Sequence, residues 1–420
     1  MKSSKKKLNV LKLVIFVIFL IILFFSFKLI IENKKVKDTK KEMINVVGKS
    51  FTDANELLSD YKLDINTTYK YDSGYDKDVI ISQSIDEGVI IDGNNKLDLV
   101  VSLGKIDKEK LKKDNINELG KVPIMMYHGI RDLSDSDTKY TGGNVDKDGY
   151  NRTVESFRRD LEFYYSKGYR MIKLSDYING KIDVPYGYSP IIITFDDGKE
   201  NNIKVTGLDD NGNIVIDKNS AVGVLEEFKK KYPDYNVTAI FFVNQGLFEQ
   251  PEYNEKILKW LVDNNYEVGN HTKNHDNFSK IDSSKTQEVV GYMYDKLNSI
   301  IGDKYSRIVA LPFGSPYNKS HDNYKYILNG KYNGVEYTTE AALRVGWEPE
   351  VSPFSKEFDK TFLKRCRAYD NNGLDFDIEM VFKNLEKNRY ISDGDVNTIV
   401  TSHTNSDDIN TNDMEVILYE

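Results

Sequence analysis

The alternation of apolar and polar positions divides the chain into three stretches of different character. An almost unbroken apolar run covers residues 13–27, where only Ser26 interrupts it. From about residue 43 to 104, short strand-like runs follow one helical segment. From residue 122 onward, apolar strand-like runs alternate with helical ones. The pattern therefore predicts a membrane helix, a small α+β module and a large α/β domain.

The apolar N-terminal run is long enough to cross a bilayer. Residues 10–31, with Lys12 and Lys28 extending toward the interfaces, supply the roughly 20 residues that a membrane helix needs. No small-x-small cleavage site follows, which favours an uncleaved anchor over a removable signal peptide. We expect a cytoplasmic tail at 1–9, an anchor at 10–31 and a tether at 32–42. Because lysines flank both ends, the positive-inside bias does not fix the orientation.

The module at 43–104 combines a short helix with three strand-like runs. Ser50 and Asp53 have the chemistry of a helix start, and the helix continues through Leu58. Turns rich in Gly, Asn and Asp separate the later strand-like runs, which cover residues 62–69, 79–84 and 96–102. The lysine-rich stretch at 105–121 is predicted to be a linker.

The domain at 122–420 has the sequence of strands and helices that builds a parallel sheet. Strand-like runs recur at 124–127, 191–195, 238–243, 266–269, 307–311, 341–345, 363–368 and 398–401. Helical patterns lie between several of them, at 157–166, 220–231 and 254–263. Such alternation over about 300 residues predicts a distorted (β/α) barrel. An insertion at 198–220, rich in Asn, Asp and Gly, is predicted to be a loop or small hairpin near the active-site rim.

Charge and cysteine content narrow the classes of function. The formal net charge of -8 argues against a nucleic-acid partner. The single cysteine, Cys366, excludes an intramolecular disulfide. The compartment must therefore be inferred from the N-terminal anchor and from the chemistry of the large domain.

Two short blocks in the large domain carry residues that suit metal-assisted hydrolysis. Asp196 and Asp197 follow an apolar strand-like run, while His271 and His275 follow another. One carboxylate and two imidazoles hold a divalent metal and leave positions open for water and substrate. The second carboxylate is then free to take a proton from the attacking water. Either block alone is weak evidence, because adjacent acids are common in solvated turns and N-caps.

Together with the run from Ala310 to Gly314, these blocks resemble the polysaccharide deacetylase superfamily. The resemblance covers about residues 122–420. It implies that Asp196 is the general base and that the metal ligands are Asp197, His271 and His275. It also implies that Phe313 donates its backbone N–H to the oxyanion. Zinc is the expected metal, although this ligand set would also accept cobalt, nickel or iron.

Two departures from the common form of that family point to its circularly permuted branch. Ala310 stands where an arginine usually orients the base, and Thr401 stands where a leucine usually precedes the acid histidine. In the permuted branch the acid histidine lies in a Tyr-His pair at the start of the domain, which corresponds to His128. His403 remains the competing candidate. A later arginine must then support the base.

The substrate side of the site offers three further candidates. Arg365 and Arg367 share one face of the predicted strand at 363–368, and either could reach inward. Trp347 is a candidate for lining the sugar cleft, with ordinary packing as the alternative.

The module at 43–104 resembles a PASTA domain, a wall-binding module. The resemblance is carried by the Asn-Val-Val-Gly sequence that starts at Asn45 and by the Val-Val-Ser-Leu-Gly sequence that ends at Gly104. It implies contact with peptidoglycan, and the alternative is a spacer that lifts the large domain from the membrane. We thus expect a membrane-anchored, extracellular, metal-dependent deacetylase of N-acetylated sugars, most simply those of peptidoglycan. The alternatives are a deacetylase of a poly-N-acetylglucosamine exopolysaccharide and a non-catalytic wall-binding or sensor protein.

Overall fold

The computed structural model describes residues 41–91, 95–411 and 413–420, and these form two compact units that divide between Ile106 and Asp107. The predicted tail at 1–9 and anchor at 10–31 lie outside the described residues. None of the helices in the described part of the chain has the length and apolarity to span a membrane.

The N-terminal unit packs one helix against a small mixed sheet. Its helix α2 (Phe51–Leu58) starts at Ser50, whose hydroxyl accepts a hydrogen bond from the Asp53 N–H at 3.1 Å. In the three-stranded sheet, β5 (Lys96–Ser102) lies between β2 (Asp64–Lys70), which is parallel to it, and β3 (Ile80–Gln83), which is antiparallel. Residues 41 and 42, predicted to belong to the tether, instead form β1 (Lys41–Glu42), which pairs with β4 (Ile90–Ile91). A 3-10 turn, η1 (Ser59–Tyr61), follows α2.

The second unit is built around a parallel sheet whose strands are buried on both faces. The order across the sheet is β18 (Ala341–Leu343), β15 (Ile308–Ala310), β14 (Glu267–Asn270), β13 (Ile240–Val243), β10 (Ser189–Phe195), β6 (Ile124–Tyr127) and β19 (Cys366–Arg367), with β9 (Tyr169–Met171) also paired to β10. Runs such as Ile191, Ile192 and Ile193 suit these positions, because both faces of each strand meet apolar neighbours.

The two edge strands of this sheet approach each other, so that the sheet curls toward a barrel. A single parallel bridge joins Leu343 of β18 to Leu363, shortly before β19. The Leu363 N–H also donates to the Ala342 carbonyl at 2.8 Å. The predicted parallel α/β architecture is therefore confirmed, although closure rests on this short contact rather than on a full ladder.

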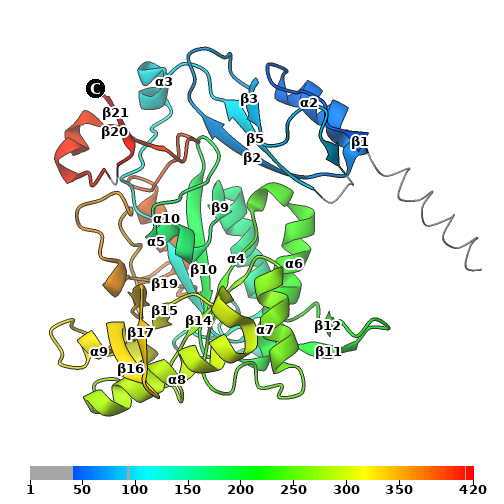
Figure 1. Ribbon diagram of the computed structural model, residues 1–420. Coiled ribbons are helices and arrows are strands. Elements are labelled where there is room, and N and C mark those ends of the chain that lie inside the picture. The colour runs from blue at the N-terminus through cyan, green and yellow to red at the C-terminus, as the bar shows by residue number, and fades with distance from the viewer. Residues whose placement is uncertain (1–40, 92–94, 412) are drawn as a thin grey trace, which may run out of the picture. The chain divides into compact units, whose positions relative to one another are not determined.

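Helices cover the outside of the sheet and bury one apolar face each against it. The longer ones are α4 (Val154–Ser166), α6 (Ala221–Lys231), α7 (Asn254–Asp263), α8 (Ser283–Ile301) and α10 (Ile378–Leu385). α4 packs beside α6, and α7 packs beside α8 (Figure 1). The patterns at 157–166, 220–231 and 254–263 correctly predicted α4, α6 and α7, whereas no helix was predicted at α8. Shorter helices are α3 (Lys108–Lys113), α5 (Leu174–Ile178) and α9 (Tyr324–Leu328).

Small accessory strands lie around the main sheet. The insertion at 198–220 forms the predicted hairpin, from β11 (Val205–Leu208) and β12 (Ile214–Ile216). A second hairpin consists of β16 (Asn329–Tyr332) and β17 (Val335–Thr338), and β7 (Ile130–Arg131) pairs with β8 (Arg152–Thr153).

One predicted barrel strand does not belong to the barrel. Residues 398–401 fall in β20 (Thr398–Ser402), which pairs only with β21 (Glu415–Tyr419) in a separate two-stranded parallel sheet. The buried Glu118 carboxylate holds it there by accepting the Val400 N–H at 2.8 Å. The prediction was wrong because an apolar β-branched run gives no sign of which sheet it joins.

Candidate active site and metal centre

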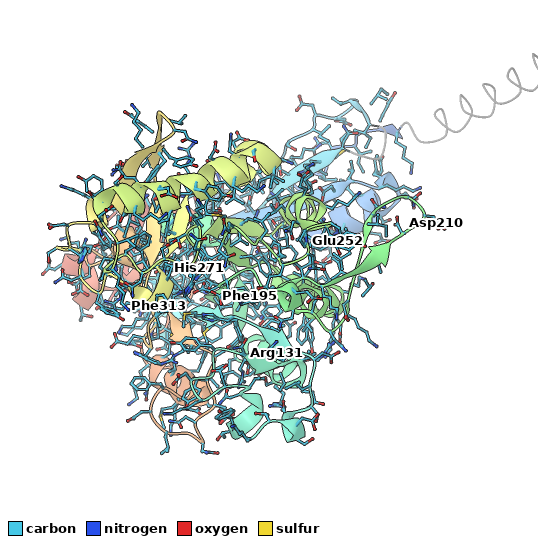
Figure 2. All side chains as sticks on the ribbon, turned by 90° about the horizontal axis from the view of Figure 1, so that it is seen from below. Arg131, Phe195, Asp210, Glu252, His271 and Phe313 are labelled. Atoms are coloured by element: carbon cyan, nitrogen blue, oxygen red, sulfur yellow. The ribbon has the colours of Figure 1, made fainter. Side chains whose placement is uncertain are left out.

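Four of the predicted site residues follow three strands of the parallel sheet, at the edge where those strands end. Asp196 and Asp197 follow β10, His271 follows β14, and His128 follows β6. The ends of parallel strands share one edge of a sheet, so residues from distant parts of the sequence meet there. Figure 2 looks onto this part of the molecule, where His271, Phe313 and Phe195 lie near one another.

Three of these side chains form a cluster with the composition of a metal site. The Oδ1 atom of Asp197 lies 3.3 Å from Nε2 of His271 and 3.5 Å from Nε2 of His275. One ligand atom from each of the three residues lies within 4.8 Å of the others. Asp197 and His275 both have positive φ, at 77° and 57°, a conformation that bends each backbone sharply after its strand.

The hydrogen bonding of His271 leaves its second ring nitrogen available to a metal. Its Nδ1 lies 2.9 Å from the Ala310 carbonyl oxygen, a partner that can only accept a proton. The ring therefore carries its hydrogen on Nδ1 and its lone pair on Nε2. That Nε2 is buried without a hydrogen-bond partner. A divalent cation would satisfy this nitrogen, so the residues present fit the metal that the sequence predicted.

The Asp197 carboxylate is held in its ionised form. Burial tends to raise its pKa, but the adjacent imidazole of His271 and the charges of His128 and His275 outweigh burial, so that the pKa falls well below the ordinary aspartate value. A carboxylate that stays ionised at every physiological pH is a ready metal ligand.

The neighbouring carboxylate, Asp196, is buried and engaged by a single cation. Two nitrogens of the Arg365 guanidinium donate to its two oxygens, each at 2.7 Å. Burial tends to raise the pKa of Asp196, but the adjacent Arg365 overcomes that effect and lowers it. The Arg365 Nε donates to the Arg344 carbonyl at 2.8 Å, which fixes the guanidinium plane. Asp196 is thus an oriented, ionised carboxylate.

Arg367, the other predicted arginine, lies apart from Asp196 in a group of aromatic rings. Its guanidinium carbon is 3.2 Å from the centroid of the Trp347 ring and 4.7 Å from that of Tyr150. Trp347 also contacts Phe376, with 4.7 Å between ring centroids, and both rings are partly exposed. The two arginines that the sequence left open therefore have different surroundings.

His128 is placed beside the two carboxylates, with one ring nitrogen still unsatisfied. Its Nδ1 is buried and has no hydrogen-bond partner. The edge of its ring meets Tyr150, with 4.8 Å between centroids, while Asn202 donates to its carbonyl at 2.7 Å. Burial lowers the pKa of His128, and the charges of Asp196 and Asp197 oppose that effect without cancelling it.

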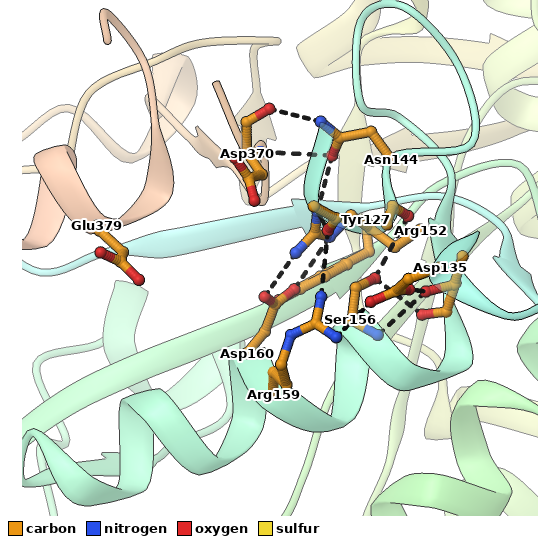
Figure 3. A network of polar contacts seen from close by, with 12 residues as sticks. Tyr127, Asp135, Asn144, Arg152, Ser156, Arg159, Asp160, Asp370 and Glu379 are labelled. Carbon is orange, nitrogen blue, oxygen red and sulfur yellow. Dashed lines mark hydrogen bonds and ion pairs between the residues drawn. The ribbon is translucent and has the colours of Figure 1, made fainter. Parts of the chain in front are cut away.

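The other member of the Tyr-His pair points away from the site, as alternation along a strand requires. The Tyr127 hydroxyl lies 3.1 Å from an Asp160 carboxylate oxygen and 2.8 Å from the Tyr164 hydroxyl. Arg152 pairs with the same Asp160 at 2.7 Å, within a network that reaches Asn144 and Asp370 (Figure 3). This buried network fixes the end of β6 and hence the position of His128. Sequence reasoning missed it, because the spacing of Arg152 and Asp160 resembles that of surface charges.

The remaining two candidates occupy exposed positions. His403 begins η9 (His403–Asp408), directly after β20, and its side chain is exposed. Phe313 lies in η7 (Pro312–Gly314) with φ of 58°, and its ring contacts His275 at 4.5 Å between centroids. The Phe313 ring thus contacts a residue of the metal cluster, whereas His403 follows a strand outside the main sheet.

Comparison with known families agrees with both sequence resemblances. The family model for polysaccharide deacetylases matches residues 184–328, and that for the PASTA domain matches residues 41–103. The chain therefore contains a polysaccharide deacetylase domain and a PASTA domain. A search of the curated proteins finds no match.

Several solved structures resemble the chain at low sequence identity. BA0330 of Bacillus anthracis, classed as a polysaccharide deacetylase, is 21% identical with a TM-score of 0.42, and the match covers 59% of this chain and 64% of that one, less than two thirds of its length. Streptococcus pyogenes deacetylase PplD, solved with acetate, is 18% identical with a TM-score of 0.44, covering 64% and 98%. IcaB of Ammonifex degensii is 17% identical with a TM-score of 0.37, covering 59% and 91%.

Proposed function

We propose that the protein is a metal-dependent polysaccharide N-deacetylase that is anchored in the membrane and acts outside the cell on N-acetylated sugars, most simply those of peptidoglycan. The observation that carries the proposal is the pairing of two different carboxylates at one strand end. Asp197 joins two imidazoles in a cluster that fits a metal, while Asp196 is held off that cluster by Arg365. Hydrolysis of an acetamide needs both arrangements at once.

Asp197, His271 and His275 would hold the metal, with zinc expected and cobalt, nickel or iron also compatible. When bound, such a metal lowers the pKa of water and polarises the acetamide carbonyl. The protein's part is to present three ligand atoms on one side and leave the other side open. The exposure of His275 and Asp197 toward solvent is consistent with that opening.

Asp196 would accept the proton of the attacking water at a carboxylate oxygen. Its low pKa keeps it ionised, and the two Arg365 hydrogen bonds prevent it from turning toward the metal ligands. Asp197 would therefore act as a metal ligand and Asp196 as the base, because a carboxylate bound to a metal loses most of its basicity.

His128 would donate a proton to the amine nitrogen as the bond between that nitrogen and the acetyl carbon breaks, releasing acetate. Its buried Nδ1 without a partner and its place beside both carboxylates support this role over the exposed His403. The Phe313 N–H would donate to the acetyl oxygen, on which negative charge develops. Trp347, with Arg367 against its face, would line the sugar-binding side.

The substrate is tested by measuring acetate and free amine released from purified peptidoglycan and from poly-N-acetylglucosamine exopolysaccharide. Release from peptidoglycan alone supports the proposal, and release from the exopolysaccharide alone replaces it with the alternative polymer. A protein that binds a stoichiometric divalent metal yet releases acetate from neither would favour the non-catalytic wall-binding alternative. Metal content of the purified protein is measured alongside.

The location proposed for the protein rests on its N-terminal sequence and its chemistry. Residues 10–31 have the length and apolarity of an anchor. Peptidoglycan lies outside the membrane, so the large unit must follow the anchor on the outer side. Intact cells are treated with a protease that cannot cross the membrane. The protease should digest the large unit if that unit lies outside the cell, and should leave it intact if the orientation is reversed.

The PASTA domain would retain the enzyme on the wall without taking part in catalysis. We predict that a protein starting at Asn115 binds purified sacculi more weakly than one starting at Met43 but turns over short soluble oligosaccharides equally well. The reason is that the N-terminal unit is compact by itself and carries none of the residues of the metal cluster. Equal retention on sacculi would leave only the spacer interpretation.

A further inference from the structure

A separate pocket lies between α8 and the β16–β17 hairpin, at the end of the sheet away from the proposed catalytic centre. Arg307 lines it and directly precedes β15, whereas the carbonyl of Ala310, which ends β15, lies 2.9 Å from Nδ1 of His271. The length of β15 therefore separates the pocket from the metal cluster. Its volume is about 240 Å³. Sites for drug-sized ligands have about 300–1,000 Å³, so the pocket suits one sugar unit rather than a chain.

Two glycines let the hairpin approach α8 closely enough to form this pocket (Figure 1). A Cβ atom at Gly291 would lie 2.3 Å from the Cβ atom of Tyr332, and one at Gly330 would lie 2.3 Å from the Tyr337 hydroxyl oxygen. That hydroxyl donates to the Tyr326 carbonyl at 2.6 Å, which holds the hairpin in place. Close backbone packing thus sets the shape of the pocket.

Tyrosine rings line the pocket. The ring centroid of the buried Tyr294 lies 5.7 Å from that of Tyr305 and 5.7 Å from that of Tyr337. The Tyr294 hydroxyl lies 2.8 Å from the Thr339 hydroxyl, which fixes the central ring. Tyr305 and Tyr337 are partly exposed. The C–H face of a sugar ring packs against such rings, while its hydroxyl groups remain free for polar partners.

The charged groups of the lining have no protein partners. Arg307 is exposed, and no described residue forms a hydrogen bond or ion pair with its guanidinium. The carboxylates of Asp295 and Glu336 are exposed as well, and they too are unpaired within the described ranges. Donors and acceptors are therefore both available, as sugar hydroxyl groups require. A polyanion would meet two carboxylates against one guanidinium, so a neutral sugar fits better.

We infer that this pocket binds a single sugar unit of the polysaccharide, apart from the unit being deacetylated, so that the larger unit holds its polymer at two separate places. The inference rests on the proposed function for the identity of the polymer. Tyr305 would pack against the sugar ring, and Arg307 and Asp295 would bind its hydroxyl groups. This second site would keep the enzyme on an insoluble polymer between turnovers. It would not change the turnover of a short soluble oligosaccharide.

The test uses the full chain with the tetramer of N-acetylglucosamine as the probe. Hydrogen exchange of residues 329–338 is followed by mass spectrometry, after a chelator has removed the metal so that the probe is not turned over. In the wild type this exchange should slow as the probe is added, and its concentration dependence gives a Kd for the pocket. Asp295→Ala and Arg307→Ala, both at exposed positions, should each raise that Kd about tenfold, the effect of one lost hydrogen bond to a charged group. With metal present, kcat/KM for acetate release from the tetramer should stay unchanged.

Asp303→Ala is the matched control. Asp303 is an exposed aspartate in η6 (Gly302–Lys304), directly after α8, and it does not line the pocket. Its removal should leave both the Kd and kcat/KM unchanged. The inference is overturned if hairpin exchange does not slow in the wild type, if neither pocket variant changes the Kd, or if kcat/KM falls as much as the affinity does. Slowed exchange with the expected Kd changes but without acetate release would instead count against the proposed function alone.

Discussion

Two strand ends in the larger unit each present a histidine, and only one of these histidines lies near Asp196 and Asp197. His128 follows β6, which lies between β10 and β19 in the parallel sheet. His403 follows β20, which pairs only with β21. Both strands are largely buried, and a short run of bulky residues marks each of them in the sequence without showing which sheet it joins. The difference shows that a residue at a strand end gains its function from the sheet that the strand joins.

Buried carboxylates also differ between the end of the parallel sheet and the surroundings of β20. At the barrel mouth, Arg365 and the histidines overcome the effect of burial and hold the pKa values of Asp196 and Asp197 low. Beside β20 no cation among the described residues does so, and burial raises the pKa values of Glu118 and Asp393. The first pair therefore stays charged, whereas the Glu118 carboxylate of the second pair accepts the hydroxyl of Tyr390 and the N–H of Val400 in β20.

The largest expected effect distinguishes the roles of Asp196 and Asp197 at the end of β10. Asp196→Asn should reduce deacetylation by roughly 10²–10⁴-fold, the usual range for a general base, and leave the metal bound. His271→Ala should instead lose the metal, because it removes one of three ligands. Metal content by elemental analysis, together with acetate release, separates the two outcomes. An Asp196→Asn protein without metal would show that the roles of Asp196 and Asp197 are exchanged.

The metal cluster was predictable from sequence because its residues are few and specific. Asp196, Asp197 and His271 directly follow apolar strands, and the structure brings Asp197, His271 and His275 together. The choice of Arg365 over Arg367 was not predictable. Both belong to one short segment, and which one reaches Asp196 depends on the Arg344 carbonyl brought close by the Leu343–Leu363 bridge.

The strands of the parallel sheet were also predictable from the sequence. Apolar runs located β6, β10, β13, β14 and β15, because strands of a parallel sheet are apolar on both faces. The displacement of β20 was not predictable, because it follows from the burial of Glu118 and from Thr398 donating to the Asp393 carboxylate. Those contacts join residues far apart in the chain, and no local pattern reports them.

The second expected effect concerns His128, the proposed general acid at the end of β6. His128→Ala should reduce turnover by at least about a hundredfold, because the leaving amine loses its proton donor, while metal content stays the same. An acid must be protonated to act, so the rate falls as pH rises through the pKa of His128. Because burial lowers that pKa, the alkaline limb of kcat/KM should begin below the ordinary imidazole range, and it should disappear in the variant.

The third prediction tests the region around β20 through stability. Burial raises the pKa of Asp393 from 3.8 to about 6, so the folded state binds a proton more tightly than the unfolded state. The protonated Asp393 side chain therefore contributes its full stabilisation below pH 4. As pH rises toward 6 this stabilisation is lost, and the free energy of unfolding falls by up to about 3 kcal/mol. Asp393→Asn should flatten this dependence in thermal unfolding followed by circular dichroism from pH 4 to 7. Identical pH slopes for the two proteins would contradict it.

The smallest expected effect is at His403, and it completes the comparison of the two strand ends. The side chain is exposed, and it follows a strand that lies outside the main parallel sheet. His403→Ala should therefore cost less than about tenfold in turnover, far below the loss expected for a general acid. It should also keep the alkaline limb that His128→Ala removes. Measuring both variants over the same pH range separates the two assignments, because a large loss at His403 with a small one at His128 would place the acid at the end of β20.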